Sequence, residues 1–335
     1  MKLKKLLFVA AVGLSVSCSS QQEEILLPSW NDTPVKQKLI EFINIDVEKI
    51  PVEDRVAVFD MDGTIACERP LGFEMVTSVH RMLERGEEEP AIKETTEYKF
   101  AKLLSVNPRD TAVFNHCYVN GKNFMDNITM KAFEGMDNED YVKYAHQYLN
   151  TARDKKFNMI YADMFYQPVL ELIDVLKDKQ FKIYVVSGSM LGLVWSVCPQ
   201  NTGLDRQHLM GTYINLDVSF PTGGPVAYTL KGTMQLPKNN YYGKSVNIYN
   251  HIGKTPIMAI GNTHGDFGMF HMASCSPYPH FALMLNHDDD VREYAYPPHK
   301  GSTPHWQDSL RINGWLQADM SKEFKVVWKQ TKSSK

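Results

Sequence analysis

The feature that most constrains this chain is a short apolar run that leads directly into two carboxylates, at residues 56–65. The four residues VAVF are too few for a helix and are typical of a strand buried on both faces of a parallel sheet. Asp60 and Asp62 follow at once, then Gly63 and Thr64. Two acids beside a buried strand are costly unless a cation or a proton offsets their charge. The segment is therefore either a strand ending in a polar Asp-Gly turn or one part of a charged site.

Further buried strands are predicted along the chain, with helical patterns between them. Apolar segments of strand length lie at residues 183–186, 256–260 and 281–285. The first of these leads into Ser187, and the second leads into the polar cluster at residues 261–266. Strands that alternate with helices predict an α/β fold, a Rossmann-like parallel sheet with helices on both faces. In such open sheets, ligands bind beyond the carboxyl ends of the strands.

Residues 66–165 interrupt the alternation, because no strand pattern occurs among them. Glycines and prolines divide this segment into helical stretches, because these residues tend to end a helix. The predicted helices span residues 74–83, 91–104, 123–133 and 139–149. We therefore expect an all-helical cap domain inserted after the first strand. Residues 211–233 favour an antiparallel hairpin around a Pro-Thr-Gly-Gly turn.

The first 20 residues are typical of a cleaved export signal. Lysines precede an apolar run from Leu6 to Val16, and small residues follow it. Cys18 stands where a bacterial lipobox, which this segment resembles, carries the cysteine that becomes lipidated. The resemblance implies an exported lipoprotein of the periplasm or outer membrane, with surface exposure left open and plain secretion or cytosolic residence as the alternatives. Residues 19–34 would form a tether, and Thr33-Pro34 predicts the start of a helix.

The composition is that of an ordinary globular protein, with 43% hydrophobic residues and a net charge of −3. Nothing in it supports nucleic-acid binding, which requires a basic surface, and the chain gives no indication of a protein partner. The cysteines beyond the leader are widely and irregularly spaced and include no CxxC pair, so we expect them to be buried free thiols. They are Cys67, Cys117, Cys198 and Cys275.

Taken in order, four polar clusters resemble the motifs of the haloacid dehalogenase superfamily. They are Asp60-x-Asp62-Gly63-Thr64, then Ser187, then Lys244 at the head of a helix, and then Gly261-Asn262-x-x-x-Asp266. The segments at residues 166–172, 286–289 and 314–315 resemble a phosphoserine-phosphatase-like branch of exported bacterial members. The resemblance covers most of residues 54–290. It implies a core formed by residues 35–65 and 166–335, with residues 66–165 as the cap.

The resemblance also implies a chemistry. Asp60 would attack phosphorus to form an aspartyl-phosphate, and Asp62 would act as general acid and base. Thr64, Ser187, Gly188 and Lys244 would bind phosphate oxygens. The implied cofactor is Mg²⁺, which prefers about six oxygen ligands. Its predicted site comprises Asp60, Asp62 through its backbone carbonyl, Asn262 and Asp266.

One residue departs from the superfamily pattern, because Asn262 stands where the fourth motif usually carries Asp. An amide oxygen still ligates Mg²⁺, but one negative charge is lost, and Asp266 is expected as an outer partner or a replacement ligand. Taken singly, Ser187 and Asp266 also fit helix N-caps, and Lys244 fits a surface lysine. Arg69 fits either a contact to an anionic substrate or a surface ion pair.

The predicted activity is hydrolysis of a small phosphomonoester by a magnesium-dependent phosphatase. Asp62 favours phosphate-ester hydrolysis over dehalogenation. In the superfamily that this chain resembles, dehalogenation needs neither this acid nor magnesium. Two alternatives remain. One is a phosphotransferase that uses the same intermediate, and the other is a non-catalytic surface-binding lipoprotein on a degenerate fold.

Overall fold

The computed structural model describes residues 26–119, 124–296 and 306–329. The predicted leader, Cys18 and most of the predicted tether lie outside these residues. Within them, no helix is both long and apolar enough to cross a bilayer.

Six strands form one parallel sheet in the order β3-β2-β1-β6-β7-β8, with β1 in its interior. This confirms the predicted α/β class and adds two strands, β3 and β8, that the sequence did not predict. The strands of the sheet are β1 (Val56–Phe59), β2 (Lys182–Met190), β3 (Leu209–Thr212), β6 (Met258–Gly261), β7 (Phe281–Asn286) and β8 (Leu316–Asp319).

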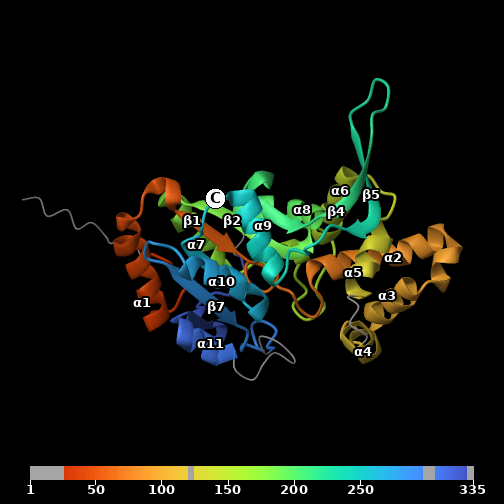
Figure 1. The fold of residues 1–335 in the computed structure, drawn as a ribbon. Helices are drawn as coiled ribbons and strands as arrows, with labels where there is room; N and C mark the ends of the chain where they lie inside the picture. The colour runs from red at the N-terminus through yellow and green to blue at the C-terminus, as the bar shows by residue number, and fades with distance from the viewer. Residues whose placement is uncertain (1–25, 120–123, 297–305, 330–335) are drawn as a thin grey trace, which may run out of the picture.

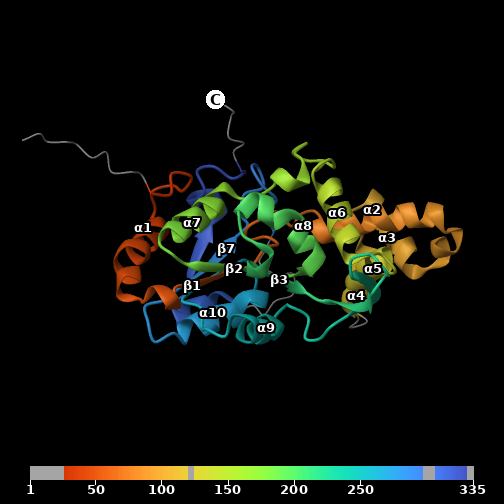
Figure 2. The same ribbon diagram turned by 90° about the horizontal axis from the view of Figure 1, so that it is seen from above.

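Helices cover both faces of the sheet, as Figure 2 shows from above. Side chains alternate along a strand, so Ala57 and Phe59 join one buried cluster with α7 (Gln167–Asp178) and α8 (Leu191–Thr202). Val58 points the other way and packs in a second cluster with α9 (Tyr242–Ile252) and α10 (Phe267–Ser274). The two cores explain why β1 is apolar at every position. The remaining core helices are α1 (Pro34–Glu41), α11 (Trp306–Asn313) and α12 (Met320–Glu323).

The segment after β1 forms a helical body beside the sheet, at the right of Figure 1. Four of its five helices match predicted stretches, and α4 was missed. These helices are α2 (Phe73–Glu88), α3 (Thr96–Val106), α4 (Thr111–Val119), α5 (Phe124–Phe133) and α6 (Asn138–Leu149). We call this body the cap. It places α2 and α5 over the carboxyl ends of the strands.

The predicted hairpin is present as β4 (Ile214–Ser219) and β5 (Ala227–Met234), and it projects on the cap side in Figure 1. It lies in the range assigned to the core, yet its backbone bonds to the cap. The Gly135 amide donates to the Leu230 carbonyl, and the Leu230 amide donates to the Met136 carbonyl, both at 2.9 Å. The hairpin therefore attaches to the cap through Leu230 of β5.

The four cysteines in the described residues are free, as expected. Cys67, Cys117 and Cys198 are buried, but Cys275 is exposed, so the expectation of burial was wrong for that residue. Cys275 directly follows the last turn of α10, where the chain returns to the surface.

Candidate active site

The carboxyl ends of β1, β2 and β6 lie side by side, because these strands are adjacent and parallel. Asp60 follows β1, Ser187 lies toward the carboxyl end of β2, and Asn262 follows β6. A cavity of about 240 Å³ opens between these ends and the cap. The predicted site residues that line it are Asp60, Asp62, Gly188, Lys244, Asn262 and Asp266.

Lys244 joins two of the acids. Its ammonium donates to Asp60 Oδ1 at 2.5 Å and to Asp266 Oδ1 at 2.6 Å, and all three side chains are buried. Burial disfavours the charge on Lys244, but Asp266 and Asp60 outweigh this, so the pKa of Lys244 is raised. Burial also raises the pKa of Asp60, an effect that Lys244 opposes. Lys244 is thus a buried cation of the site and not a surface lysine.

Asp62 is held by two hydroxyl groups on one side only. Ser187 Oγ and Ser189 Oγ each donate to Asp62 Oδ2 at 2.9 Å. The other oxygen, Oδ1, is buried and has no hydrogen-bond partner among the described residues. Burial raises the pKa of Asp62, while the serine hydrogen bonds lower it. The site therefore presents one fixed, unpaired carboxyl oxygen next to the cavity.

Thr64 and Gly188 lie close to these acids. Thr64 Oγ1 donates to Asp60 Oδ2 at 3.2 Å. Gly188 lines the cavity, and its carbonyl accepts from Thr212 Oγ1 at 2.8 Å. Ser187 does not cap α8, because Met190 occupies the N-cap position and β2 continues up to it.

The loop after β6 is ordered by Asp266. Asp266 Oδ2 accepts the backbone amides of Asn262 and Thr263, each at 3.0 Å, and Thr263 Oγ1 accepts the Gly265 amide at 3.2 Å in a capping box. Asp266 stands at the N-cap position of α10 but makes no side-chain cap hydrogen bond to that helix. Its side chain is instead the N3 partner of Thr263 in the capping box, and its other oxygen binds Lys244. Both oxygens of Asp266 are engaged.

The loop after β1 needs its glycine. Gly63 has a φ of +81°, and a Cβ built on it would lie 1.9 Å from Asn262 Nδ2. The Gly63 carbonyl accepts a hydrogen bond from His287 Nε2 at 2.7 Å, which means that this nitrogen carries a proton. The loop after β1 is therefore fixed both by its own turn and by His287 in the loop after β7.

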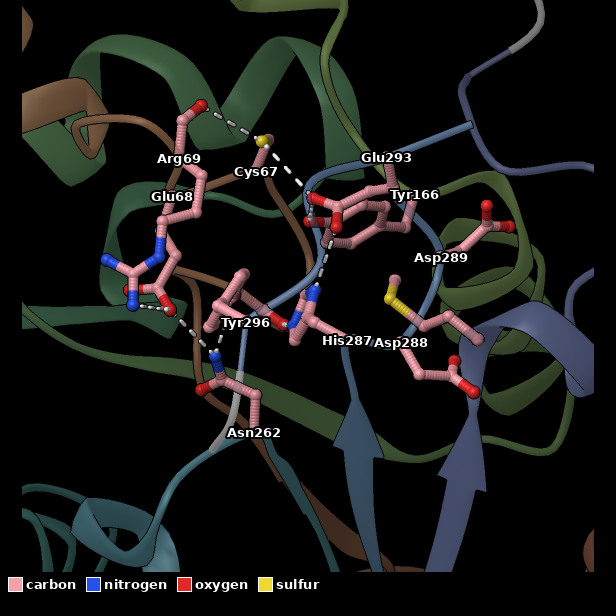
Figure 3. Close-up of polar contacts among 12 residues, drawn as sticks. Cys67, Glu68, Arg69, Tyr166, Asn262, His287, Asp288, Asp289, Glu293 and Tyr296 are labelled. Carbon is pink, nitrogen blue, oxygen red and sulfur yellow. Dashed lines mark hydrogen bonds and ion pairs between the residues drawn. The ribbon is translucent and has the colours of Figure 1, made fainter. Parts of the chain in front are cut away.

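A buried polar network extends from His287, as Figure 3 shows. His287 Nδ1 lies 3.2 Å from Glu293 Oε2, and Glu293 Oε1 accepts from the Tyr166 hydroxyl at 2.8 Å. Cys67 Sγ lies 3.5 Å from the same oxygen. Tyr296 stacks on the His287 ring with their centroids 4.3 Å apart. The network links the loops that follow β1 and β7.

The cap closes the other side of the cavity with charged groups. Glu74 on α2 accepts the Met190 amide at 2.5 Å and the Thr129 hydroxyl at 3.2 Å. Lys238 donates to Asp126 on α5 at 2.6 Å. Burial raises the pKa of Glu74 to about 7, although Lys238 opposes the shift. The cap and the core therefore meet through polar contacts that line the cavity.

Several residues of the site were not predicted from the sequence. Ser189 carried a weak signal, because it lies two positions after Ser187 on a strand and so points to the same side. Glu74, Asp126 and Lys238 carried none, since each reads as an ordinary residue of a helix or a surface loop. Arg69 has its guanidinium 4.0 Å from the centroid of the Tyr296 ring. Arg69 therefore contacts Tyr296 and Glu68 of its own chain.

A family model described as haloacid dehalogenase-like hydrolase matches residues 57–271. No curated protein matches the chain.

The solved structures that resemble this chain have low sequence identity to it. A conserved protein of unknown function from Anaerococcus prevotii is 14% identical, covers 83% of this chain and 88% of its own, and has a TM-score of 0.48. A protein of unknown function from Bordetella pertussis is 10% identical, with 79% and 98% covered and a TM-score of 0.49. A phosphoserine phosphohydrolase-like protein from Francisella tularensis is 10% identical, with 80% and 97% covered and a TM-score of 0.41.

The family match spans more than half of the chain and includes the loops that carry Asp60, Lys244 and Asn262. The chain therefore belongs to the haloacid dehalogenase-like hydrolases, and it is a hydrolytic enzyme.

Proposed function

We propose that this hydrolase is a magnesium-dependent phosphatase that acts on a small phosphomonoester through an aspartyl-phosphate on Asp60. One observation carries the proposal. Asp62 lies two positions from Asp60, has one oxygen fixed by two serines and keeps the other unpaired beside the cavity. A nucleophile with an adjacent, oriented acid is the arrangement that phosphate-ester cleavage through a covalent intermediate requires.

The reaction would proceed in two steps. In the first, an Asp60 carboxylate oxygen bonds to phosphorus, the bond to the leaving oxygen breaks, and Asp62 donates its proton to that oxygen. In the second, Asp62 takes a proton from water, the water oxygen bonds to phosphorus, and the phosphorus–Asp60 bond breaks. Inorganic phosphate is released and both carboxyl groups return to their starting state. The raised pKa of Asp62 favours the protonated form that the first step needs.

Lys244 would hold Asp60 in place and offset the charge on the phosphoryl group. Thr64 donates to the second oxygen of Asp60, and the Ser187–Gly188 segment, of which Gly188 lines the cavity, would receive phosphate oxygens. A preorganised cation and fixed donors stabilise charge that builds up in the transition state, and such electrostatic effects are a large part of catalysis.

The residues present fit a magnesium ion. No group of three or more His, Cys, Asp or Glu side chains in the described residues is placed to hold a metal, so the candidate ligands are of mixed type. They are an Asp60 oxygen, the Asp62 carbonyl and Asn262 Oδ1, an all-oxygen set of the kind that Mg²⁺ prefers. Asn262 turns its amide nitrogen toward Glu68, which leaves its oxygen for a cation. When bound, the ion would neutralise phosphate charge. Asp266, with both oxygens engaged, would act as an outer partner.

The substrate is proposed to be small and polar. The cavity holds about 240 Å³, and its cap side presents Glu74, Asp126 and Lys238 together with Met75 and Met125. A leaving group would therefore meet charged groups at the rim of the cap and thioether surface between them. The sequence resemblance to phosphoserine-phosphatase-like enzymes supports the same substrate size.

The activity is tested with the purified protein and a chromogenic aryl phosphate. We expect turnover with Mg²⁺, loss of turnover with EDTA, and loss of turnover in the Asp60→Asn variant. Activity that persists in EDTA or in Asp60→Asn, above the level of a mock purification, contradicts the proposal. Transfer of phosphate to an added alcohol in preference to water would assign a phosphotransferase.

We also propose that the chain is exported and held at a membrane through a lipid on Cys18, on the basis of its leader. Metabolic labelling with an alkyne fatty acid tests this, since the wild-type chain should incorporate the label and fractionate with membranes. A Cys18→Ala variant should do neither. Labelling that survives in the variant contradicts the assignment.

A further inference from the structure

Asn262 is the residue at which this chain departs from the superfamily pattern, and the structure shows what lies next to it. Its Nδ2 donates to Glu68 Oε1 at 3.1 Å and lies 3.4 Å from the Tyr296 hydroxyl, as Figure 3 shows. Asn262 is 1% exposed. Since an ionised carboxylate only accepts hydrogen bonds, the amide nitrogen must face Glu68 and the amide oxygen must face away.

Tyr296 lies beside this contact, with its hydroxyl 3.4 Å from Asn262 Nδ2. Burial raises the pKa of Tyr296, and the neighbouring Glu68 adds to the shift. Arg69 covers the Tyr296 ring at 4.0 Å, and its Nη2 lies 3.8 Å from Glu68 Oε1. The Glu68 carboxylate therefore accepts a hydrogen bond from the Asn262 amide, and the Arg69 guanidinium lies further from it.

An aspartate at position 262 would not fit this arrangement. It would place a second carboxylate about 3 Å from Glu68, where like charges disfavour each other strongly. In this chain position 262 is neutral, and a carboxylate lies one hydrogen bond away from it, on Glu68. Gly63 also lies close to Asn262 Nδ2, so position 63 has no room for a side chain.

We propose that Glu68 and Asn262 act as one cation-binding unit, in which Glu68 orients the Asn262 oxygen toward the metal and supplies the negative charge that the amide lacks. The inference rests on the proposed magnesium site. It makes Glu68 a positioning residue, not a substrate contact, even though Glu68 borders the same cavity. Partners of this kind, one bond removed from the metal, typically change metal affinity 10–100-fold when they are altered.

The test is Mg²⁺ binding to the full chain by isothermal titration calorimetry in the absence of substrate. Glu68→Gln keeps an oxygen that can accept from Asn262 but removes the charge, and we expect its Kd for Mg²⁺ to rise about ten-fold. Glu68→Ala removes both and should weaken binding further. Glu87→Gln is the matched control, because Glu87 is exposed and pairs with Lys93, and its Kd should equal that of the wild type.

A reciprocal exchange separates this role from general damage to the fold. In the double variant Glu68→Gln/Asn262→Asp, the introduced glutamine can donate to the introduced aspartate, so the hydrogen bond is kept with its direction reversed. We expect the Kd for Mg²⁺ to return to within about three-fold of the wild type, as expected when two coupled substitutions compensate. Asn262→Asp alone should lower the Tm of the metal-free protein, and Mg²⁺ should raise that Tm more than it does in the wild type.

The outcomes are distinguishable. Weakened binding in Glu68→Gln together with recovery in the double variant supports the paired unit. A wild type that binds Mg²⁺ while Glu68→Gln binds it equally well overturns the inference and leaves the proposed function intact. An unchanged Kd with a raised KM in Glu68→Gln also overturns it, and assigns Glu68 to the substrate. A wild type that binds no Mg²⁺ at all overturns the proposed function, and the inference with it.

Discussion

Lys244 and Asp60 are 184 positions apart in the chain, yet the lysine ammonium lies 2.5 Å from the aspartate oxygen inside the protein. The contact exists because β1 and the start of α9 meet at the same end of the sheet. The same ammonium binds Asp266, so one buried cation serves two buried acids. We therefore expect both stability and catalysis to depend on this ion cluster.

Replacing Lys244 should therefore affect both properties. Lys244→Ala leaves Asp60 and Asp266 buried without their cation, which costs about 3–5 kcal/mol when a buried pair loses one partner. Urea unfolding measures this loss, and the activity assay should show none or little remaining. Lys254→Ala is the control, since Lys254 pairs with Asp54 at the surface and should change stability by less than about 1 kcal/mol. Equal effects in the two variants would contradict the role given to Lys244.

Removing the acid should affect poor leaving groups most. Asp62→Asn keeps the shape of the side chain but cannot donate a proton as an acid, so kcat should fall about 10²–10⁴-fold on an alkyl phosphate. The fall should be smaller on a nitrophenyl phosphate, whose leaving group needs little protonation. Steady-state kinetics with both substrates provide the comparison. An equal loss on both would argue against general acid catalysis by Asp62.

Glu74 should make stability depend on pH. Its pKa in the folded protein is raised from 4.5 to about 7, chiefly by burial, so the folded state binds a proton more tightly than the unfolded state. Stability from this group is fully present below pH 4.5 and is lost as the pH rises to about 7, by up to ~3 kcal/mol.

The Glu74→Gln variant isolates this effect, because it keeps an acceptor for the Met190 amide without the charge. Relative to the wild type, its unfolding free energy should improve steadily between pH 4.5 and pH 7, as followed by urea denaturation at several pH values. A stability difference that does not change with pH would show that Glu74 has an ordinary pKa in the folded protein.

Gly63 should tolerate no side chain. Gly63→Ala combines a left-handed backbone with a Cβ 1.9 Å from Asn262 Nδ2, so it should lower the Tm and weaken Mg²⁺ binding. Gly253→Ala provides the comparison, because Gly253 has a φ of +67° with nothing within 4 Å of its Cβ. That variant should lose only about 1 kcal/mol from backbone strain. If Gly63→Ala cost no more, the close approach to Asn262 would have no energetic weight.

The sequence predicted those parts of the site that local patterns reveal. Asp60 and Asp62 are evident because a buried run leads directly into acids, and Lys244 because it begins a helix shortly before the last polar cluster. Glu74 was not predicted, since an acid in the first turn of an amphipathic helix is ordinary. Its carboxylate accepts a hydrogen bond from the backbone amide of Met190, which lies 116 positions away in the chain. Contacts over such separations are set by the packing of cap against core.

The same limit applies to the fold. β1 and β7 were predicted because they are buried apolar runs, whereas β8 is a short edge strand of mostly half-buried residues. The hairpin was predicted as a hairpin, but its attachment to the cap through Leu230 and Gly135 has no local signal. The departure at Asn262 was visible in the sequence. Its counterpart Glu68 became recognisable only when the two side chains were seen together.

Transfer of the phosphoryl group to Asp60 is tested by trapping the phosphorylated protein in acid. The full chain is mixed with a phosphomonoester and Mg²⁺, quenched in acid within the first turnovers, and mapped by peptide mass spectrometry. We predict one added phosphoryl group on the peptide that contains Asp60, removable by hydroxylamine and absent from Asp60→Asn. Sustained turnover with no phosphorylated Asp60 at any quench time, or with the phosphoryl group on another residue, would contradict it.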